Sequence, residues 1–289
     1  MNEMHIAEFW NTLDDNVVRF GLCPHRCHIQ NNSNGFCVVR ENRNGVLYAS
    51  TYGCVSSIAL DPIEKKPLNM FHTGKNILSI GSFGCNLNCG FCQNFEISKE
   101  YSDAQRVANY MTPNDIISIA IDTMSRNNIG VAYTYNEPLI GFEFVRDCAV
   151  LIHDSGLLNV LVTNGFINAD PLAGLLPLID AMNIDLKGFS EDFYSGVGGV
   201  LEVVKDTIAM AVKHCHVEVT TLVIPNENED DIEDIAKWLS SIDSDIPLHL
   251  SRFFPRYRYA DKTATQRDKI MRLADKAKKH LNNVITGNM

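Results

Sequence analysis

The sequence has no run of about eighteen apolar residues, the minimum that a membrane-spanning helix needs. Its first fifteen residues include four acidic side chains and no basic-then-apolar segment of the kind that marks a secretory signal. We therefore expect a cytoplasmic protein. The sequence also lacks an excess of positive charge, because 35 acidic residues outnumber 25 basic ones and give a formal net charge of −10. Because nucleic-acid binding needs basic side chains to neutralise phosphates, we do not expect nucleic acid as a partner.

The chain also lacks short internal repeats and low-complexity segments. What it has is 289 residues, 45% of them apolar, which is enough for one large α/β domain or two smaller ones.

From residue 76 onward, apolar runs of strand length alternate with amphipathic runs of helical length. Strands are expected at 77–82, 130–135, 158–163, 181–186, 217–224, 248–253 and 284–286. Helices are expected at 112–124, 142–153, 171–178, 201–213, 230–241 and 266–281. Such β/α units call for a parallel sheet covered by helices, and their number falls short of a full eight-unit barrel. The predicted fold is an α/β partial (β/α)6 TIM-like barrel.

The segment before residue 76 follows another pattern. Ile6, Phe9, Trp10 and Leu13 share one helical face, which predicts an amphipathic helix within 1–22. Asn44-Gly45 between two short apolar runs predicts a hairpin with arms 36–40 and 46–52. Residues 53–75 read as irregular. We therefore divide the chain into an N-terminal extension, 1–75, and a barrel domain, 76–289.

The loop 82–94 contains three cysteines, Cys85, Cys89 and Cys92, in a C-x3-C-x2-C spacing after an expected strand. Three thiolates this close can converge on one inorganic centre. A [4Fe–4S] cluster normally takes four thiolates, so three would leave one iron open to a small molecule. Zinc is the alternative, but it usually takes four protein ligands, and the sequence offers no obvious fourth here.

Polar residues stand at the carboxyl ends of the next five strands, where ligands bind in barrels of this type. They occur at 133–137, 163–165, 183–187, 220–221 and 249–252. One such residue is explained by helix capping or loop hydrogen bonds, whereas the whole set indicates one large polar ligand.

A second group of cysteines lies in the N-terminal extension. Cys23, Cys27 and Cys37, with Cys54 as a further candidate, could hold a second metal centre of zinc or iron and sulfur, or could be ordinary thiols. In a reducing compartment, clustered cysteines are more often metal ligands than disulfides. The run 61–68, with two acids and two lysines between prolines, is either a solvated turn or part of an active-site lining.

The cysteine loop, with Phe91 before the third cysteine, resembles the cluster motif of the radical S-adenosylmethionine (SAM) superfamily. The resemblance is closer to its activating-enzyme branch, typified by pyruvate formate-lyase activating enzyme, and closest to the radical SAM enzyme of the AmmeMemoRadiSam system. The segments that carry it are 22–27, 61–68, 84–86 with 92–94, 183–188 and 251–253.

This resemblance implies roles for individual residues. Cys85, Cys89 and Cys92 would bind a [4Fe–4S] cluster whose open iron takes SAM. The SAM contacts would come from Asn136, Glu137, Thr163, Asn164, Asp185, Lys187, Val223, Ile224 and His249. Thr220 stands where activating enzymes often have an arginine.

The implied activity is that of an anaerobic oxidoreductase. It would reductively cleave SAM to a 5′-deoxyadenosyl radical, which takes hydrogen from a small molecule, a peptide or a partner protein. Flavodoxin or ferredoxin would donate the electron. A glycyl-radical activating enzyme is one alternative, and a non-catalytic iron–sulfur or zinc scaffold or redox sensor is another. The catalytic residue that acts on the substrate is not identified.

Overall fold

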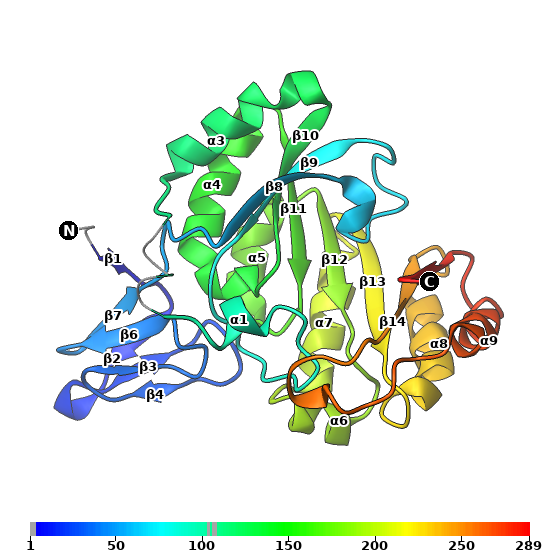
Figure 1. The fold of residues 1–289 in the computed structure, drawn as a ribbon. Coiled ribbons are helices and arrows are strands. Elements are labelled where there is room, and N and C mark those ends of the chain that lie inside the picture. The colour runs from blue at the N-terminus through cyan, green and yellow to red at the C-terminus, as the bar shows by residue number, and fades with distance from the viewer. Residues whose placement is uncertain (1–3, 103–104, 106–108) are drawn as a thin grey trace.

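The main sheet forms an open barrel in which each strand lies beside the previous one in the chain. In the computed structural model, which describes residues 4–102, 105 and 109–289, its order is β15-β14-β13-β12-β11-β10-β9-β8 (Figure 1). The strands are β8 (Ser57–Pro62), β9 (Asn76–Gly81), β10 (Asn128–Tyr133), β11 (Leu158–Thr163), β12 (Ala181–Asp185), β13 (His216–Val223), β14 (Leu248–Arg252) and β15 (Val284–Gly287). From β9 to β15 every pairing is parallel. The predicted partial barrel is confirmed.

Helices connect the strands of this sheet, and the longer ones cover its outer face (Figure 1). They are α1 (Phe95–Ser98), α3 (Pro113–Asp122), α4 (Phe142–Asp154), α5 (Ala169–Leu175), α6 (Glu191–Gly196), α7 (Leu201–Ala211), α8 (Ile232–Ile242) and α9 (Arg267–Ala277). Local sequence explains their starts. Thr112 caps α3 in a reciprocal capping box with Asp115, as its position before Pro113 predicts. The short helices α1 and α6 were not predicted, because four to six residues give too little periodicity.

The prediction of irregular structure over 53–75 is wrong at β8, which pairs antiparallel with β9 at the edge of the main sheet. The connection from β8 to β9 then fills the amino-terminal end of the barrel. Ile63 and Leu68 from this connection pack with Ile77 of β9 in a fully buried apolar cluster. Part of the predicted N-terminal extension is thus built into the sheet, and the boundary after residue 75 stays a prediction.

A buried carboxylate holds this connection in place. Glu218 on β13 accepts hydrogen bonds from the backbone N–H groups of Asn69 and Met70, at 3.0 and 2.7 Å. Its oxygens also lie 3.0 Å from Nε2 of His216 and 2.5 Å from Nε2 of His249. Burial alone would raise the pKa of Glu218, but the contacts with the two histidines and the two backbone donors lower it to about 2.

This carboxylate should make stability fall in acid. Because its pKa is lower in the folded protein than its ordinary value of 4.5, its stabilisation is complete above pH 4.5 and is lost as the pH falls toward 2. We expect Glu218→Gln to reduce the free energy of unfolding at pH 7 by roughly 3 kcal/mol. Urea unfolding at pH 7 and at pH 3 should show this difference shrinking in acid. An equal difference at both values would contradict the assignment.

The N-terminal residues form two small antiparallel sheets, where a helix was predicted. One sheet has the order β1-β7-β6-β5 and the other β2-β3-β4. Their strands are β1 (His5–Ile6), β2 (Trp10–Thr12), β3 (Val18–Phe20), β4 (His28–Ile29), β5 (Ser33–Asn34), β6 (Arg40–Arg43) and β7 (Val46–Ala49). The predicted helix within 1–22 is wrong, because β1 pairs with β7 and β2 with β3, and Phe9 has a left-handed backbone with φ of 56°.

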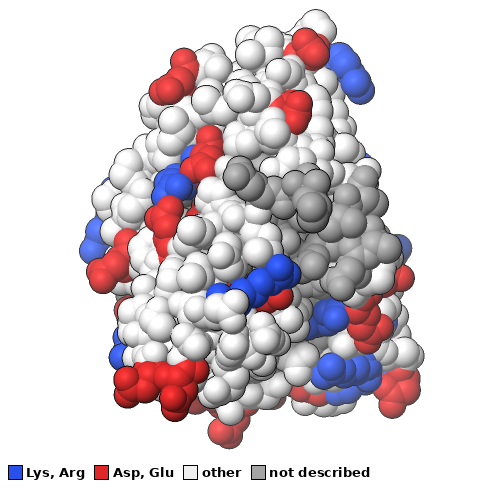
Figure 2. Space-filling model, turned by 90° about the vertical axis from the view of Figure 1, so that its left-hand side faces the viewer, with Lys and Arg blue, Asp and Glu red and all other residues white. Residues whose placement is uncertain are grey.

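The predicted hairpin is confirmed around Asn44-Gly45, both of which have positive φ. Its first arm begins at Arg40 and not at residue 36, since Val38 closes a turn on Gly35. Figure 2 shows this side of the molecule, where acidic and basic side chains are scattered among uncharged ones.

A buried ion pair joins the N-terminal sheets to the barrel. The two terminal guanidinium nitrogens of Arg40 each lie 2.7 Å from a carboxylate oxygen of Glu143 on α4, and both side chains are almost completely buried. Arg40 also donates to the carbonyl of Ile140, and Glu143 accepts from the backbone N–H of Glu8. This network makes the position of the N-terminal sheets depend on α4.

In the part of the chain that the structure describes, no helix is both long and apolar enough to cross a membrane.

Candidate functional site

Most of the residues predicted to bind the cluster and SAM line one cavity of about 370 Å³ at the carboxyl ends of the parallel strands. One wall is the loop after β9, with Cys85, Cys89 and Cys92. The other walls come from residues at or after the ends of β10 to β14, namely Tyr135, Asn136, Glu137, Thr163, Asn164, Asp185, Lys187, Thr220, Leu222 and Ser251. The structure therefore brings together polar residues that lie up to 223 positions apart in the chain (from Lys65 to Asn288).

The cysteine loop is held by contacts on both sides. The side-chain amide of Asn136 donates to the carbonyls of Phe83 and Gly84, at 3.0 and 3.1 Å, and its oxygen accepts from the backbone N–H of Ser82 at 2.9 Å. Gly84 has φ of 84°, and a Cβ there would lie 2.6 Å from Cγ1 of Val39. The N-terminal extension therefore packs directly behind the loop, and Asn136 acts here as a brace for it.

The surroundings of Cys85 and Cys89 raise the pKa of both thiols. Burial raises the pKa of Cys85 strongly, and the neighbouring Glu137 and Cys89 raise it further. Burial also raises the pKa of Cys89 to about 11, against the opposing charge of Lys187. Partly buried thiols such as these are deprotonated when a metal binds them. The backbone N–H of Leu87 points at the sulfur of Cys85 from 3.3 Å, a donor of the type that surrounds cluster thiolates.

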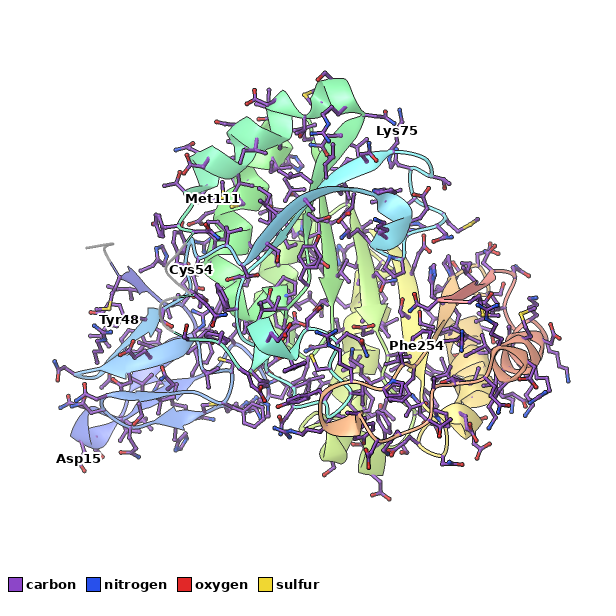
Figure 3. All side chains as sticks on the ribbon, in the orientation of Figure 1. Asp15, Tyr48, Cys54, Lys75, Met111 and Phe254 are labelled. Atoms are coloured by element: carbon purple, nitrogen blue, oxygen red, sulfur yellow. The ribbon has the colours of Figure 1, made fainter. Side chains whose placement is uncertain are left out.

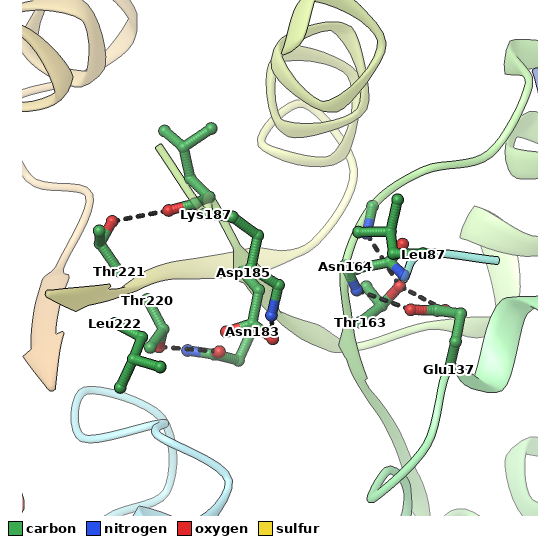
Figure 4. Close-up of polar contacts among 12 residues, drawn as sticks. Leu87, Glu137, Thr163, Asn164, Asn183, Asp185, Lys187, Thr220, Thr221 and Leu222 are labelled. Carbon is green, nitrogen blue, oxygen red and sulfur yellow. Dashed lines mark hydrogen bonds and ion pairs between the residues drawn. The ribbon is translucent and has the colours of Figure 1, made fainter. Parts of the chain in front are cut away.

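Glu137 links two of the cavity walls (Figure 4). One of its oxygens accepts from the Thr163 hydroxyl at 2.7 Å and from the backbone N–H of Leu139 at 2.9 Å. The other accepts from the backbone N–H of Asn164 at 2.7 Å. Burial raises the pKa of Glu137 to about 7, and these hydrogen bonds act against the rise. A carboxylate has about four acceptor positions, so one remains for a donor in the cavity.

The opposite wall carries a partly buried ion pair. The ammonium of Lys187 lies 2.7 Å from a carboxylate oxygen of Asp185 (Figure 4). Burial by itself would lower the pKa of Lys187. The negative charge of Asp185 outweighs this effect, so the pKa is raised. Beside this pair the Thr220 hydroxyl donates to the side-chain oxygen of Asn183 at 2.9 Å. Thr220 thus lines the cavity and is itself occupied by a hydrogen bond.

Three of the predicted SAM contacts do not line the cavity. Val223 and Ile224 are completely buried, and His249 is held by Glu218 deeper in the barrel. Side chains alternate across a strand, so Leu222 faces the cavity where Val223 cannot. Ser251 also lines it, two positions beyond His249. Alternation along β13 and β14 was the signal that could have identified Leu222 and Ser251.

Of the two roles expected for the run 61–68, a solvated turn or part of an active-site lining, the structure places part of the run in the cavity lining. Lys65 and Lys66 line the cavity together with Tyr135. No local pattern could show this, since the run precedes β9 and reaches the cavity only because β8 pairs with that strand.

The N-terminal cysteines separate into two places. The pKa of Cys23 is raised to about 12, by burial first and then by the nearby thiols of Cys37 and Cys27. Cys54 instead forms a β-bridge with Tyr110, next to Met111 (Figure 3). Among the described residues, no group of three or more His, Cys, Asp or Glu side chains is arranged to hold a single metal ion. A second centre at these cysteines stays a prediction.

Comparison with known proteins decides the family. The Radical SAM superfamily matches residues 79–239, which include the whole cysteine loop and the strands from β10 to β13. The chain belongs to the radical SAM superfamily. It is also 43% identical over 264 residues to the uncharacterized protein MJ0808 of Methanocaldococcus jannaschii, covering 89% of this chain and 77% of that protein. A radical SAM enzyme is therefore the correct description of its class.

A more distant relative has a named activity. Pyruvate formate-lyase 1-activating enzyme of Escherichia coli strain K12 is 27% identical over 158 residues, covering 51% of this chain and 61% of that enzyme.

Solved radical SAM structures share the fold at low identity. Streptococcus suis SuiB bound to precursor peptide SuiA aligns with 72% of this chain and 47% of its own, at a TM-score of 0.57 and 13% identity. TYW1 with a lysine-pyruvate adduct bound aligns with 78% of this chain and 84% of its own, at a TM-score of 0.50 and 16% identity. These likenesses support the partial barrel. The superfamily implies a [4Fe–4S] cluster and SAM as the cofactors of this chain.

Proposed function

We propose that this radical SAM enzyme holds its [4Fe–4S] cluster through Cys85, Cys89 and Cys92 and binds SAM in the adjoining cavity. The observation that carries the proposal is the position of the three thiols in one wall of a cavity whose other walls are polar. Bound together, cluster and SAM supply a one-electron reductive cleavage of the sulfonium, releasing methionine and a radical that takes a hydrogen atom from the substrate.

The chain's own residues would bind and orient SAM. Glu137 has one acceptor position left for the amino group, and a charge-assisted hydrogen bond is strong in this buried setting. Thr163 and Asn164 fix that carboxylate, so their effect on SAM is partly indirect. Asp185 and Lys187 would contact the polar part of the nucleoside or methionine from the other side.

The apolar contact to the adenine would come from β13. Leu222 offers its side chain to the cavity, while Val223 and Ile224 can contribute only from behind it, through backbone and packing. His249 would act indirectly, through its contact with Glu218, which holds the connection at the amino-terminal end of the barrel.

A glycyl-radical activating enzyme is the second candidate, favoured by the similarity to pyruvate formate-lyase 1-activating enzyme. That similarity covers about half of this chain, and the N-terminal sheets add a wall behind the cysteine loop. A small molecule or peptide is the first candidate for the substrate. In either case a protein such as flavodoxin or ferredoxin would donate the electron.

The test is anaerobic reconstitution with iron and sulfide, followed by SAM and dithionite. We expect 5′-deoxyadenosine and methionine in equal amounts, and about four iron atoms per chain for one cluster. Protein that carries the cluster and forms no 5′-deoxyadenosine would contradict the proposal and favour the scaffold or redox-sensor alternative. Iron well above four, or bound zinc, would support a second centre at Cys23, Cys27 and Cys37.

A further inference from the structure

A pair of lysines stands in the wall of the cavity that the proposed SAM contacts do not occupy. Only 3% of the surface of Lys66 is exposed, yet this residue lines the cavity that contains the three cluster cysteines. Lys65 lines the same cavity beside it, with its side chain 68% exposed. A buried ammonium needs partners, because transfer from water penalises the charge strongly.

The lysines share one acid. The ammonium of Lys66 lies 3.0 Å from one oxygen of Asp61, and that of Lys65 lies 3.7 Å from the other. The Tyr135 hydroxyl donates to the same carboxylate at 2.9 Å. The ring of Tyr135 also faces Lys66, whose ammonium is 4.6 Å from the ring centre. Two positive charges thus stand against one negative charge, which leaves this wall with a surplus of one cation.

The other charged groups of the cavity do not cancel this surplus. Lys187 is paired with Asp185 on the opposite wall, and Glu137, held there by Thr163 and Asn164, is the carboxylate proposed to take the positively charged amino group of SAM. The pKa of Lys66 is lowered, first by burial and also by the neighbouring Lys65, although Asp61 raises it. Its charge is therefore incompletely compensated by the protein.

The wall is held in a fixed geometry. Tyr135 has a left-handed backbone with φ of 71°, which costs free energy in a residue with a bulky side chain. The side-chain amide of Asn94 donates to the carbonyl of Tyr135 at 2.6 Å. Gly81 leaves room for the ring, since a Cβ there would lie 2.9 Å from Cδ2 of Tyr135. Strain maintained by separate segments is typical of a ligand-binding position.

We propose that Lys66, supported by Lys65, Asp61 and Tyr135, binds an anionic group of the substrate, a carboxylate or a phosphate. The proposal rests on the proposed function, because it assigns the remaining cavity wall to the substrate. Asp61 holds the ammonium in place until the anion arrives, and the surplus cation supplies the attraction. The substrate class is thus a molecule with a carboxylate or phosphate within reach of the hydrogen that is removed.

The test is calorimetric titration of two simple anions, succinate and inorganic phosphate, into reconstituted protein with SAM and without reductant. At least one should bind saturably at one site, and the tighter one identifies carboxylate or phosphate as the natural group. Lys66→Gln should weaken this binding by about tenfold or more, while Lys66→Arg keeps most of it. The matched control is Lys75→Gln, which removes a lysine outside the cavity (Figure 3) and should bind as wild type does.

Asp61→Asn separates recognition from a structural role. Because it removes the anion that competes for the lysines, it should tighten binding by about threefold or more, whereas a merely structural Asp61 would give weaker or unchanged binding. Unchanged or weaker binding by Asp61→Asn, equal binding by Lys66→Gln and wild type, or no saturable binding would each overturn the proposal.

The titration involves no cleavage of SAM, so a protein that forms no 5′-deoxyadenosine refutes the proposed function alone. A protein that forms it without binding either anion refutes the anion site alone.

Discussion

Replacement of Cys89 by alanine is expected to abolish formation of 5′-deoxyadenosine and the visible absorption of the cluster. Cys89 is the middle of the three thiols in the cavity wall, and two ligands from the protein cannot hold a cluster that already has one open iron. We expect activity to fall by more than about a hundredfold, since even outer partners of metal ligands change affinity or activity by 10–100-fold. Absorption spectra, iron content and product analysis after anaerobic reconstitution measure the change.

The matched control is Cys215→Ala. The sulfur of Cys215 contacts the carbonyl of Ala211 outside the cavity, so this variant should keep both the cluster and the product. Cys85→Ala and Cys92→Ala should behave as Cys89→Ala does. Retention of a normal cluster by any of these three would show that the ligand set is different.

Replacement of Arg40 by methionine is expected to lower the free energy of unfolding by about 3–5 kcal/mol. The loss comes mainly from Glu143, whose carboxylate would remain buried without its cation. Urea unfolding followed by tryptophan fluorescence is well suited, because Trp10 lies in the N-terminal sheets and Trp238 in α8 of the barrel. Both probes should report the loss, since the pair joins these two parts.

The control for this variant is an exposed pair of the same type. Arg272 and Asp268 pair on the surface of α9, each with 63% of its side chain exposed, so Arg272→Met should change stability by less than about 1 kcal/mol. Adding Glu143→Leu to Arg40→Met should recover part of the loss, because it removes the unpaired charge. A loss below about 1 kcal/mol in Arg40→Met would mean that water or another cation reaches Glu143.

The barrel was predictable because its signals are local. Each strand predicted from residue 76 onward is present, and it begins and ends within two residues of the expected positions. A helix also begins at Thr112-Pro113, as expected. Parallel strands buried on both faces appear as short apolar runs, and helix caps depend on residues three positions apart. These patterns do not depend on what the rest of the chain does.

The N-terminal segment was misjudged because its structure comes from pairing. The strand β1 has two residues and exists because it lies beside β7, more than forty positions away. Ile6, which was expected on the buried face of a helix, is 55% exposed. Short strands contain too few residues for their alternation to be recognised. The helical spacing of Ile6, Phe9, Trp10 and Leu13 arises by chance and was the stronger signal.

The site was predictable to the extent that residue type implies chemistry. The spacing of Cys85, Cys89 and Cys92 indicates a cluster wherever such a loop occurs, and the polar strand ends indicate a large ligand. The family resemblance pointed to Val223, whereas Leu222 lines the cavity, on the same face of β13 as Thr220. Spacing cannot show that Glu137 is mostly occupied by Thr163 and Asn164, which come from another strand.

By itself, the sequence determined the class of protein, the cysteine loop and the order of strands and helices from β9 onward, because those features depend on neighbours a few residues apart. Only the tertiary structure decided that Glu143 anchors Arg40, that Glu218 holds the connection before β9 and that Lys66 reaches the cavity. Each of these contacts joins residues about a hundred or more positions apart, or a side chain to a cavity made by many segments. Burial makes such contacts strong, and burial exists only once the barrel has closed around them.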